Sequence, residues 1–162
     1  ARNICLQSNI EVQSTESKLP LASYDTLSLW HVLEHLPEPE SRLATYRDLL
    51  KPEGILVIAV PNFESHDRIH YQQHWAALDV PRHLWHFTPK GLINMAEASG
   101  FDLLQKRALG LDVFYISYLS EKHRGKSLPF VRGILKAVWF SFKAFFSGKH
   151  SSCVFVFRKR LP

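Results

Sequence analysis

The chain has 162 residues, the size of one domain, of which 46% are hydrophobic and 22% are charged. This composition excludes a disordered, collagen-like or disulfide-dense protein, and no apolar run reaches the roughly 18 residues of a membrane span. The sequence has seven glycines, and the closest two, Gly125 and Gly133, are eight residues apart. A glycine-rich nucleotide-binding loop therefore cannot occur within it.

Charge is distributed unevenly along the chain. Residues 1–120 carry 10 basic and 14 acidic side chains, whereas residues 121–162 carry 10 basic side chains and one acidic one. A basic C-terminal segment suggests an anionic partner, either nucleic acid or lipid. The two cysteines, Cys5 and Cys153, match neither a zinc-binding spacing nor a disulfide framework, so a reducing, cytoplasmic setting is expected.

The first part of the chain predicts strands separated by a helix. Alternating apolar and polar residues favour a short strand at 9–13, and the segment Tyr24–Trp30 alternates in the same way and is rich in strand-forming residues. Leucine and tyrosine residues at helical spacing predict a helix over 40–51. The apolar run Ile55–Val60, which Pro61 ends, predicts a strand in the buried middle of a sheet.

Residues 62–88 form a long connection that contains five histidines and two tryptophans. A loop of this length in a compact domain is usually functional. After it, Thr88 and Pro89 are typical of the start of a helix, and Gly100 is typical of its end. The remaining predicted elements are a strand at Phe101–Leu109, helices at 111–119 and 129–146, and a last strand at Ser152–Arg160.

The alternation of strands and helices predicts an α/β layer fold with a mainly parallel sheet. In such sheets ligands bind beyond the carboxyl ends of the strands. Two segments of this sequence follow strands and are expected there, Trp30–His35 and Asn62–His86.

Several motifs within residues 20–110 carry a family resemblance. The segment 24–36 (YDTLSLWHVLEHL) resembles the fourth strand and following turn of class I S-adenosylmethionine-dependent methyltransferases. The segment 49–54 (LLKPEG) is similar to the LLKPGG turn before their fifth strand, with Glu53 in place of the first glycine. VPN at 60–62 and DVPRHLWHFTP at 79–89 match a subgroup of these enzymes with VPN and DxPRHLxHF signatures.

The resemblance implies a Rossmann-like class I methyltransferase fold, with helices on both faces of a mixed, mainly parallel sheet and an antiparallel last strand. It implies S-adenosylmethionine as the cofactor, beside Trp30, His31 and His35, with a further contact near Thr15. For Glu34 two interpretations are open, a helix-terminal charge, which is slightly favoured, and a ligand contact. The family's glycine-rich loop and its acidic ribose-binding residue have no counterpart here. Residues 1–162 are therefore expected to form a single partial domain without the N-terminal cofactor half, inactive alone.

The segment 79–86 holds the strongest candidates for chemistry, which are Asp79, Arg82, His83 and His86. His83 and His86 are suited to removing a proton from an acceptor, and Arg82 is suited to binding a carboxylate or phosphate. The alternative is a structural cluster in which Asp79 pairs with Arg82 and the histidines cap the next helix. Asn62 and Trp75 are candidates for the wall of the acceptor pocket.

His66, His70 and His74 are spaced as residues that share one helix face, as metal ligands can be. No glutamate stands in an H-E-x-x-H arrangement with them, and no cysteine or acidic cluster accompanies them. The sequence therefore predicts no metal site.

The helix at 129–146 lies within a basic helical insertion, 121–150, before the last strand. One interpretation is a lid or packing helix, since insertions at this point of the family often cover the acceptor site. The other is an amphipathic basic helix that contacts a membrane surface or a partner. Nucleic acid is not expected as a partner, because the aromatic residues follow core-like spacing instead of alternating with basic ones.

The function that these observations favour is methyl transfer from S-adenosylmethionine to a small-molecule, glycan or lipid-intermediate acceptor. The rival is a noncatalytic methyltransferase-like domain that dimerises or binds a partner. An unpaired edge strand of a partial sheet also predicts a homo-oligomer.

Overall fold

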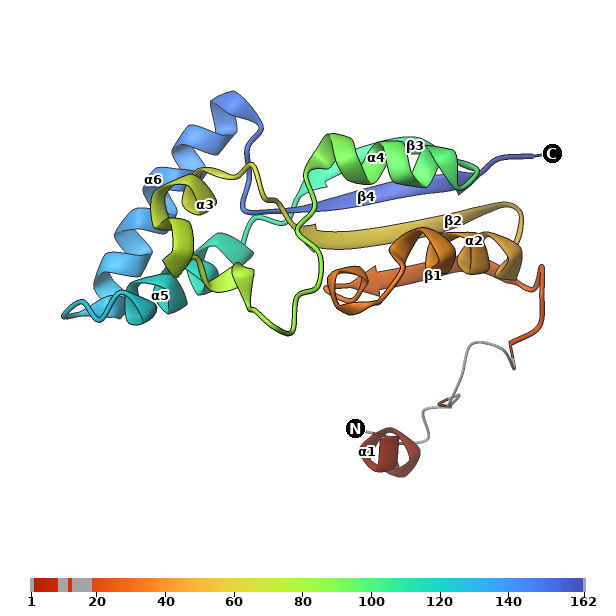
Figure 1. Ribbon diagram of the computed structural model, residues 1–162, viewed down its shortest axis with the longest axis horizontal. Coiled ribbons are helices and arrows are strands. Elements are labelled where there is room, and N and C mark those ends of the chain that lie inside the picture. The colour runs from red at the N-terminus through yellow and green to blue at the C-terminus, as the bar shows by residue number, and fades with distance from the viewer. Residues whose placement is uncertain (1, 9–11, 13–18, 162) are drawn as a thin grey trace.

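The computed structural model describes residues 2–8, 12 and 19–161, which form one four-stranded sheet with helices (Figure 1). The strand expected at 9–13 and the contact expected at Thr15 lie outside the described residues. The elements from Tyr24 onward follow the predicted order. They are α1 (Arg2–Gln7), β1 (Tyr24–Trp30), α2 (Pro39–Leu49), β2 (Leu50–Pro61), α3 (His66–Tyr71), α4 (Pro89–Ala98), β3 (Phe101–Ala108), α5 (Asp112–His123), α6 (Pro129–Ser147) and β4 (Ser152–Lys159), with 3₁₀ turns at Leu33–His35, Gln72–His74 and Ala76–Leu78.

The strands are arranged in the order β1-β2-β4-β3. β1 and β2 are parallel, and β4 is antiparallel to both β2 and β3. Three strands therefore run in one direction, and the last strand of the chain lies between two of them in the opposite direction. The predicted mixed sheet with an antiparallel last strand is confirmed, but the sheet is not mainly parallel in its pairing, because the last strand lies between two others and makes two of the three strand pairs antiparallel.

α2 and α4 pack on the same face of the sheet (Figure 1). Leu29 pairs in register with Ile58, which pairs with Phe155, and these side chains form one core with apolar residues of both helices. On the opposite face, Ser28 is exposed and Val57 is only partly buried. The sequence predicts helices on both faces, and the described part of the chain places its two packing helices on one.

The connection 62–88 is more ordered than its lack of periodicity suggests. The Ser65 Oγ atom caps α3 by accepting a hydrogen bond from the backbone N–H of Arg68 at 3.2 Å. Tyr71 and Trp75 are buried in a second apolar cluster together with residues of α5 and α6. Short helical turns of this kind carry too few residues to show a periodic pattern, so the sequence predicts only a loop.

α5 and α6 form a closely packed pair beyond the carboxyl ends of β1 and β2 (Figure 1). A Cβ atom at Gly133 would lie 2.7 Å from the Cα atom of Tyr118, so only glycine allows this approach of the two backbones. The buried Glu121 carboxylate accepts a hydrogen bond from Arg132 Nε at 2.9 Å across the pair. Burial favours the neutral acid, but Arg132 outweighs it, and the pKa of Glu121 is lowered overall.

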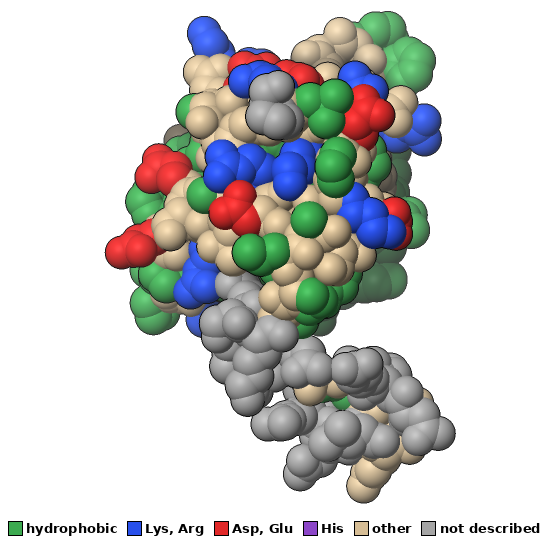
Figure 2. Space-filling model, turned by 90° about the vertical axis from the view of Figure 1, so that its right-hand side faces the viewer, with side chains coloured by type: hydrophobic (Ala, Val, Ile, Leu, Met, Phe, Trp, Pro, Cys, Tyr) green, Lys and Arg blue, Asp and Glu red, His purple; other side chains and the backbone are tan. Residues whose placement is uncertain are grey.

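The end of the molecule opposite to this helix pair has a mixed charge. Figure 2 shows basic, acidic and hydrophobic side chains interspersed on that end. Exposed ion pairs join Lys51 to Asp25 and Arg160 to Asp102, each with an N–O distance below 3 Å. None of the described helices is both long and apolar enough to cross a bilayer.

Candidate active site

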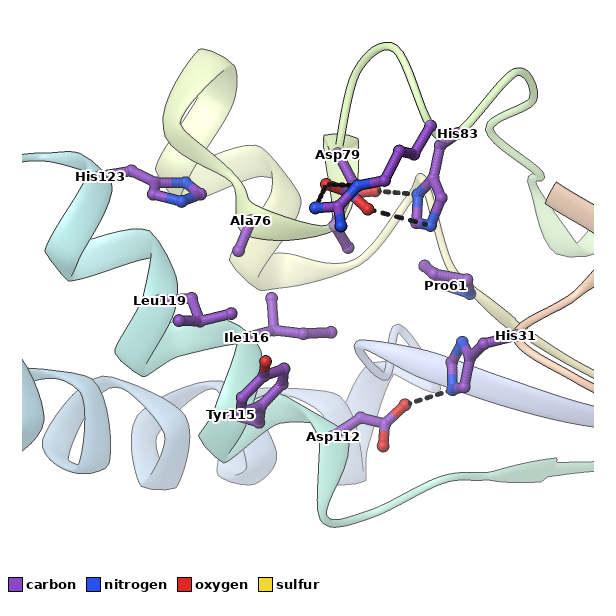
Figure 3. Close-up of a pocket in the computed structure, with 12 residues that line it drawn as sticks. His31, Pro61, Ala76, Asp79, His83, Asp112, Tyr115, Ile116, Leu119 and His123 are labelled. Atoms are coloured by element: carbon purple, nitrogen blue, oxygen red, sulfur yellow. Dashed lines mark hydrogen bonds and ion pairs between the residues drawn. The ribbon is translucent and has the colours of Figure 1, made fainter. Parts of the chain in front are cut away.

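A pocket of about 390 Å³ opens where the carboxyl ends of β1 and β2 meet α5 (Figure 3). β1 is followed by His31, β2 ends at Pro61, and the connection 62–88 adds Asp79, Arg82 and His83. α5 supplies the remaining wall, with Asp112, Tyr115, Ile116, Leu119 and His123. The pocket is therefore at the edge of the sheet where ligands of α/β folds bind.

His31 is held at the floor of the pocket between two carboxylates. Its Nε2 atom is 2.9 Å from Asp112 Oδ2, and its Nδ1 atom is 3.3 Å from Glu34 Oε1. The interaction with Asp112, followed by that with Glu34, raises the pKa of His31 from 6.5 to about 9, although burial opposes the shift. The pocket therefore contains an imidazolium cation at neutral pH.

Glu34 is a buried carboxylate that faces this cation. Its side chain is only 1% exposed, and neither carboxylate oxygen has a hydrogen-bond partner, since the contact with His31 is an ion pair without good hydrogen-bond geometry. A buried carboxylate group needs a partner of opposite charge, and His31 is that partner here. Glu34 thus contacts the pocket residue His31, and it also lies in the first turn of the 3₁₀ helix Leu33–His35, where a helix-terminal charge is expected.

Asp79, Arg82 and His83 come together on one side of the pocket. The Asp79 carboxylate accepts hydrogen bonds from the Arg82 guanidinium, and its Oδ2 atom is 4.0 Å from His83 Nε2. His83 Nδ1 donates to the carbonyl oxygen of Ala77 at 2.8 Å, because a carbonyl can only accept. A neutral His83 ring therefore has its unprotonated nitrogen, Nε2, on the side of Asp79. The Asp79–Arg82 pair expected by the structural alternative is present, and it lines the pocket.

His35 lies behind His83 and completes a set that resembles a metal centre. The two rings are 4.6 Å apart, and His35 Nδ1 is 3.0 Å from the Arg82 carbonyl oxygen. One ligand atom each from Glu34, His35 and His83 lies within 4.8 Å of the others, a donor set suited to a divalent transition metal. The His31 imidazolium already compensates the Glu34 charge at this point, and we assign no metal to the set.

Five predicted site residues lie outside the pocket lining, namely His35 behind His83 and four others. Trp30 is 52% exposed at the end of β1. His86 Nε2 is 3.0 Å from the Leu78 carbonyl oxygen, and its ring packs against Phe63. The Asn62 and Trp75 side chains are almost fully buried and are used internally. Asn62 Nδ2 donates to the His150 carbonyl, and Trp75 Nε1 donates to Asp67 Oδ2 at 2.7 Å.

His66, His70 and His74 do not come together as a metal site. His66 contacts Ser147 of α6, and His70 contacts Arg124 at the end of α5. The imidazoles of His66 and His70 therefore link α3 to two different helices.

The α5 wall of the pocket is what sequence reasoning missed. Asp112 and Tyr115 belong to a helix that the sequence predicts, but nothing in the pattern indicates that this helix returns to the end of β1. The signal available was indirect: Asp112 closely follows the Gly110 turn after a strand, at the sheet edge where ligands bind.

The fold and the pocket define a class I methyltransferase-like α/β domain. Residues 3–106 match the sequence model of a family described as a methyltransferase domain. The chain therefore belongs to the methyltransferase-domain family. A search among curated proteins gives no match.

Solved structures share the fold at low sequence identity. The [4+2]-cyclase SpnF has a TM-score of 0.59 and 17% identity, covering 100% of this chain and 62% of the cyclase. A second similar structure is a Thermotoga maritima S-adenosylmethionine-dependent methyltransferase, described as a possible histamine N-methyltransferase. Its TM-score is 0.62 at 16% identity, and the match covers 98% of this chain and 68% of the Thermotoga chain.

A third similar structure is the 1,6-didemethyltoxoflavin-N1-methyltransferase of Burkholderia thailandensis with bound 1,6-didemethyltoxoflavin and S-adenosylhomocysteine. Its TM-score is 0.55 at 15% identity, covering 99% of this chain and 56% of the enzyme. This chain thus spans less than two thirds of SpnF and of the toxoflavin enzyme. Because the fold also supports a cyclase, fold alone does not define the reaction.

Proposed function

We propose that the protein transfers a methyl group from S-adenosylmethionine to a small-molecule, glycan or lipid-intermediate acceptor. The observation that carries this proposal is the pocket at the carboxyl ends of β1 and β2, lined by the ionisable side chains of His31, Asp79 and His83. Membership of the methyltransferase-domain family supports the reaction class.

The residues at the end of β1 fit one side of the cofactor. Trp30 presents a flat apolar side chain that is 52% exposed, which suits an adenine ring. His31 lies beside it, and its two ring nitrogens face Asp112 and Glu34, so it holds the end of β1 in place against α5. S-adenosylmethionine, when bound, supplies an electrophilic methyl group. The glycine-rich loop that holds the cofactor in the family is not part of this sequence.

His83 and Asp79 are the residues proposed to assist the acceptor. His83 Nε2 is free to accept a proton from a hydroxyl or amine, and Asp79 at 4.0 Å stabilises the resulting imidazolium. Arg82 is 77% exposed at the rim, where it can bind an anionic group of the acceptor. Ile116 and Leu119 form an apolar wall that helps to exclude water.

The proposal is tested on protein expressed from its complete gene. Calorimetry with S-adenosylhomocysteine should detect binding, and His31→Gln should weaken it. Methyl-labelled S-adenosylmethionine is then offered with a panel of hydroxylated and amine acceptors, and His83→Ala should lower transfer with S-adenosylhomocysteine affinity unchanged. Absence of heat from the wild-type protein would refute the cofactor assignment. Unchanged transfer by the His83 variant would remove this residue from the mechanism.

The second candidate is a noncatalytic domain that associates through its sheet. In the described part of the chain β1 is an edge strand, and an unpaired edge invites pairing with another chain. Light scattering distinguishes the candidates when combined with the calorimetry above: a dimer that binds no S-adenosylhomocysteine supports the second, and a cofactor-binding monomer contradicts it.

A further inference from the structure

α6 presents a wide apolar surface that the described part of the chain leaves uncovered. Nine large hydrophobic side chains of this one helix are at least 36% exposed. They are Phe130, Val131, Ile134, Leu135, Val138, Trp139, Phe142, Phe145 and Phe146. With roughly 150–250 Å² for each aromatic side chain, their exposed area is on the order of 1,000 Å². The largest apolar patch of a typical monomer is about 300–600 Å², so this surface indicates a binding face.

The helix is divided into three stripes along its length. At about 100° per residue, the nine exposed apolar side chains fall within one half of the helix circumference. The buried side chains Gly133, Ala137, Phe140 and Ala144 form a narrow stripe on the other half, towards the rest of the domain. Between the buried stripe and one edge of the apolar half lies a stripe formed by Arg132, Lys136 and Lys143.

The charge around the apolar half has one sign. No aspartate or glutamate occurs between residue 122 and the end of the sequence. Exposed Lys126 and Lys149 lie just before and just after α6. Burial and the neighbouring Lys143 and Lys149 lower the pKa of His66, as expected where positive potential accumulates. This contrasts with the opposite end of the molecule, where acidic and basic side chains alternate (Figure 2).

A wide apolar face beside lysines is the pattern of a helix that lies in a membrane interface. The apolar side chains enter the boundary between headgroups and acyl chains, while lysine ammonium groups extend to anionic lipid phosphates. We propose that α6 binds the surface of an anionic lipid bilayer with its axis parallel to the membrane plane. Lys136 and Lys143, spaced along the helix, agree with a helix that lies on the membrane, whereas Arg132 is paired with Glu121 of α5. α6 does not have the character of a membrane span.

Charge complementarity favours this occupant over a second copy of the chain. Two copies facing each other through this surface in an antiparallel arrangement would have their basic stripes on the same side, with Lys136 and Lys143 of each copy near those of the other. Like charges at such an interface oppose association. An anionic bilayer satisfies the apolar half and the basic stripe together.

The test is co-sedimentation of the complete gene product with lipid vesicles. Vesicles of phosphatidylcholine mixed with phosphatidylglycerol should bind the protein, and vesicles of phosphatidylcholine alone should bind it less. The side chain of Phe145 is 79% exposed, and Phe145→Ser should lower the affinity for the mixed vesicles on the order of tenfold. Lys136→Gln and Lys143→Gln should each lose about fivefold, and added salt should weaken wild-type binding.

Matched controls make the same changes elsewhere. Leu161→Ser alters an exposed apolar residue next to the C-terminus, at the far end of the molecule from α6 (Figure 1), and Lys90→Gln alters an exposed lysine of α4. Both controls should bind vesicles like the wild type. Trp139 provides a direct reading, because lipids with brominated acyl chains should quench the part of the fluorescence that Trp139→Phe removes.

Three results would overturn the proposal. Wild-type protein that stays in solution with vesicles of every composition refutes membrane binding. Equal binding of the α6 variants and the controls places the lipid contact on another surface. A dimer that Phe145→Ser converts to a monomer, without vesicle binding by the wild type, assigns the apolar half to a second copy. The assay does not depend on methyl transfer, so its outcome is separate from that of the proposed function.

Discussion

Replacing Asp112 by asparagine tests the electrostatics of the pocket with little change in shape. Asp112 is the main reason that the pKa of His31 rises to about 9, and Glu34 at 3.3 Å contributes next. In Asp112→Asn the pKa of His31 should therefore fall towards 6.5 and remain somewhat above it. The link between α5 and the end of β1 should weaken at the same time, because the 2.9 Å ion pair is lost.

The pH dependence has a defined sign. A histidine whose pKa is higher in the folded than in the unfolded protein stabilises the fold fully below pH 6.5, and the contribution is lost as the pH rises towards 9. For a fully buried pair, this difference in pKa would correspond to roughly 3 kcal/mol. The His31 side chain is 36% exposed, so solvent screening reduces the contribution to about 1–2 kcal/mol. Asp112→Asn should remove about 1 kcal/mol of this at pH 6.5 and almost nothing above pH 9.5.

Urea unfolding of the wild type and Asp112→Asn at pH 6.5 and pH 9.5 measures how much the destabilisation by the substitution changes with pH. An NMR titration of the His31 imidazole measures its pKa. Asp102→Asn is the control, because Asp102 pairs with Arg160 on the surface and arginine keeps its charge across the whole range. A wild-type His31 that titrates near 6.5 would refute the reasoning. A destabilisation by Asp112→Asn that is as large at pH 9.5 as at pH 6.5 would refute it as well.

Three further substitutions test the packing. Gly133→Ala should destabilise the fold by about 1–3 kcal/mol, since its Cβ would lie 2.7 Å from Tyr118 Cα, and an unchanged melting temperature would show that α5 and α6 can separate without loss. Arg132→Ala leaves the buried Glu121 carboxylate without its 2.9 Å partner and should lose about 2–3 kcal/mol in urea unfolding, whereas an unaffected variant would mean that Arg124 suffices. Phe157→Ala removes a fully buried side chain from the sheet core and should lose about 3–5 kcal/mol, and a loss below about 1 kcal/mol would show that the core refills the space.

The order and type of the main elements could be predicted because local signals in the sequence agree with the fold. Thr88 caps α4 by accepting a hydrogen bond from the Gly91 N–H at 3.1 Å, and Pro89 occupies the first position of that helix. Gly148 ends α6 with a positive φ of 71°. The apolar run of β2 is buried along its second half, as a central strand requires. Each of these signals acts within a few residues of its own position.

The site depends on contacts between distant parts of the chain, and this is where prediction from sequence reached its limit. The motifs correctly bring His31, Asp79 and His83 to one pocket, because each follows a strand that ends at the same edge. Asp112 could not be assigned to His31 from spacing, since their contact depends on how α5 folds back over the sheet. Asn62 and Trp75 have the chemistry of pocket residues, yet hydrogen bonds inside the protein, to His150 and Asp67, use their polar atoms.

α5 connects the two proposals made for this protein. One side of the helix supplies Asp112 and Tyr115 to the pocket, and its backbone at Tyr118 is in contact with Gly133 of α6. α5 and α6 pack closely and share the Glu121–Arg132 ion pair, so a bilayer bound to α6 would place the pocket wall near the lipid. An acceptor carried in the membrane would then be confined near the pocket, whereas a dissolved metabolite gains nothing from that placement. If both proposals hold, the lipid intermediate is therefore the acceptor class that the arrangement favours.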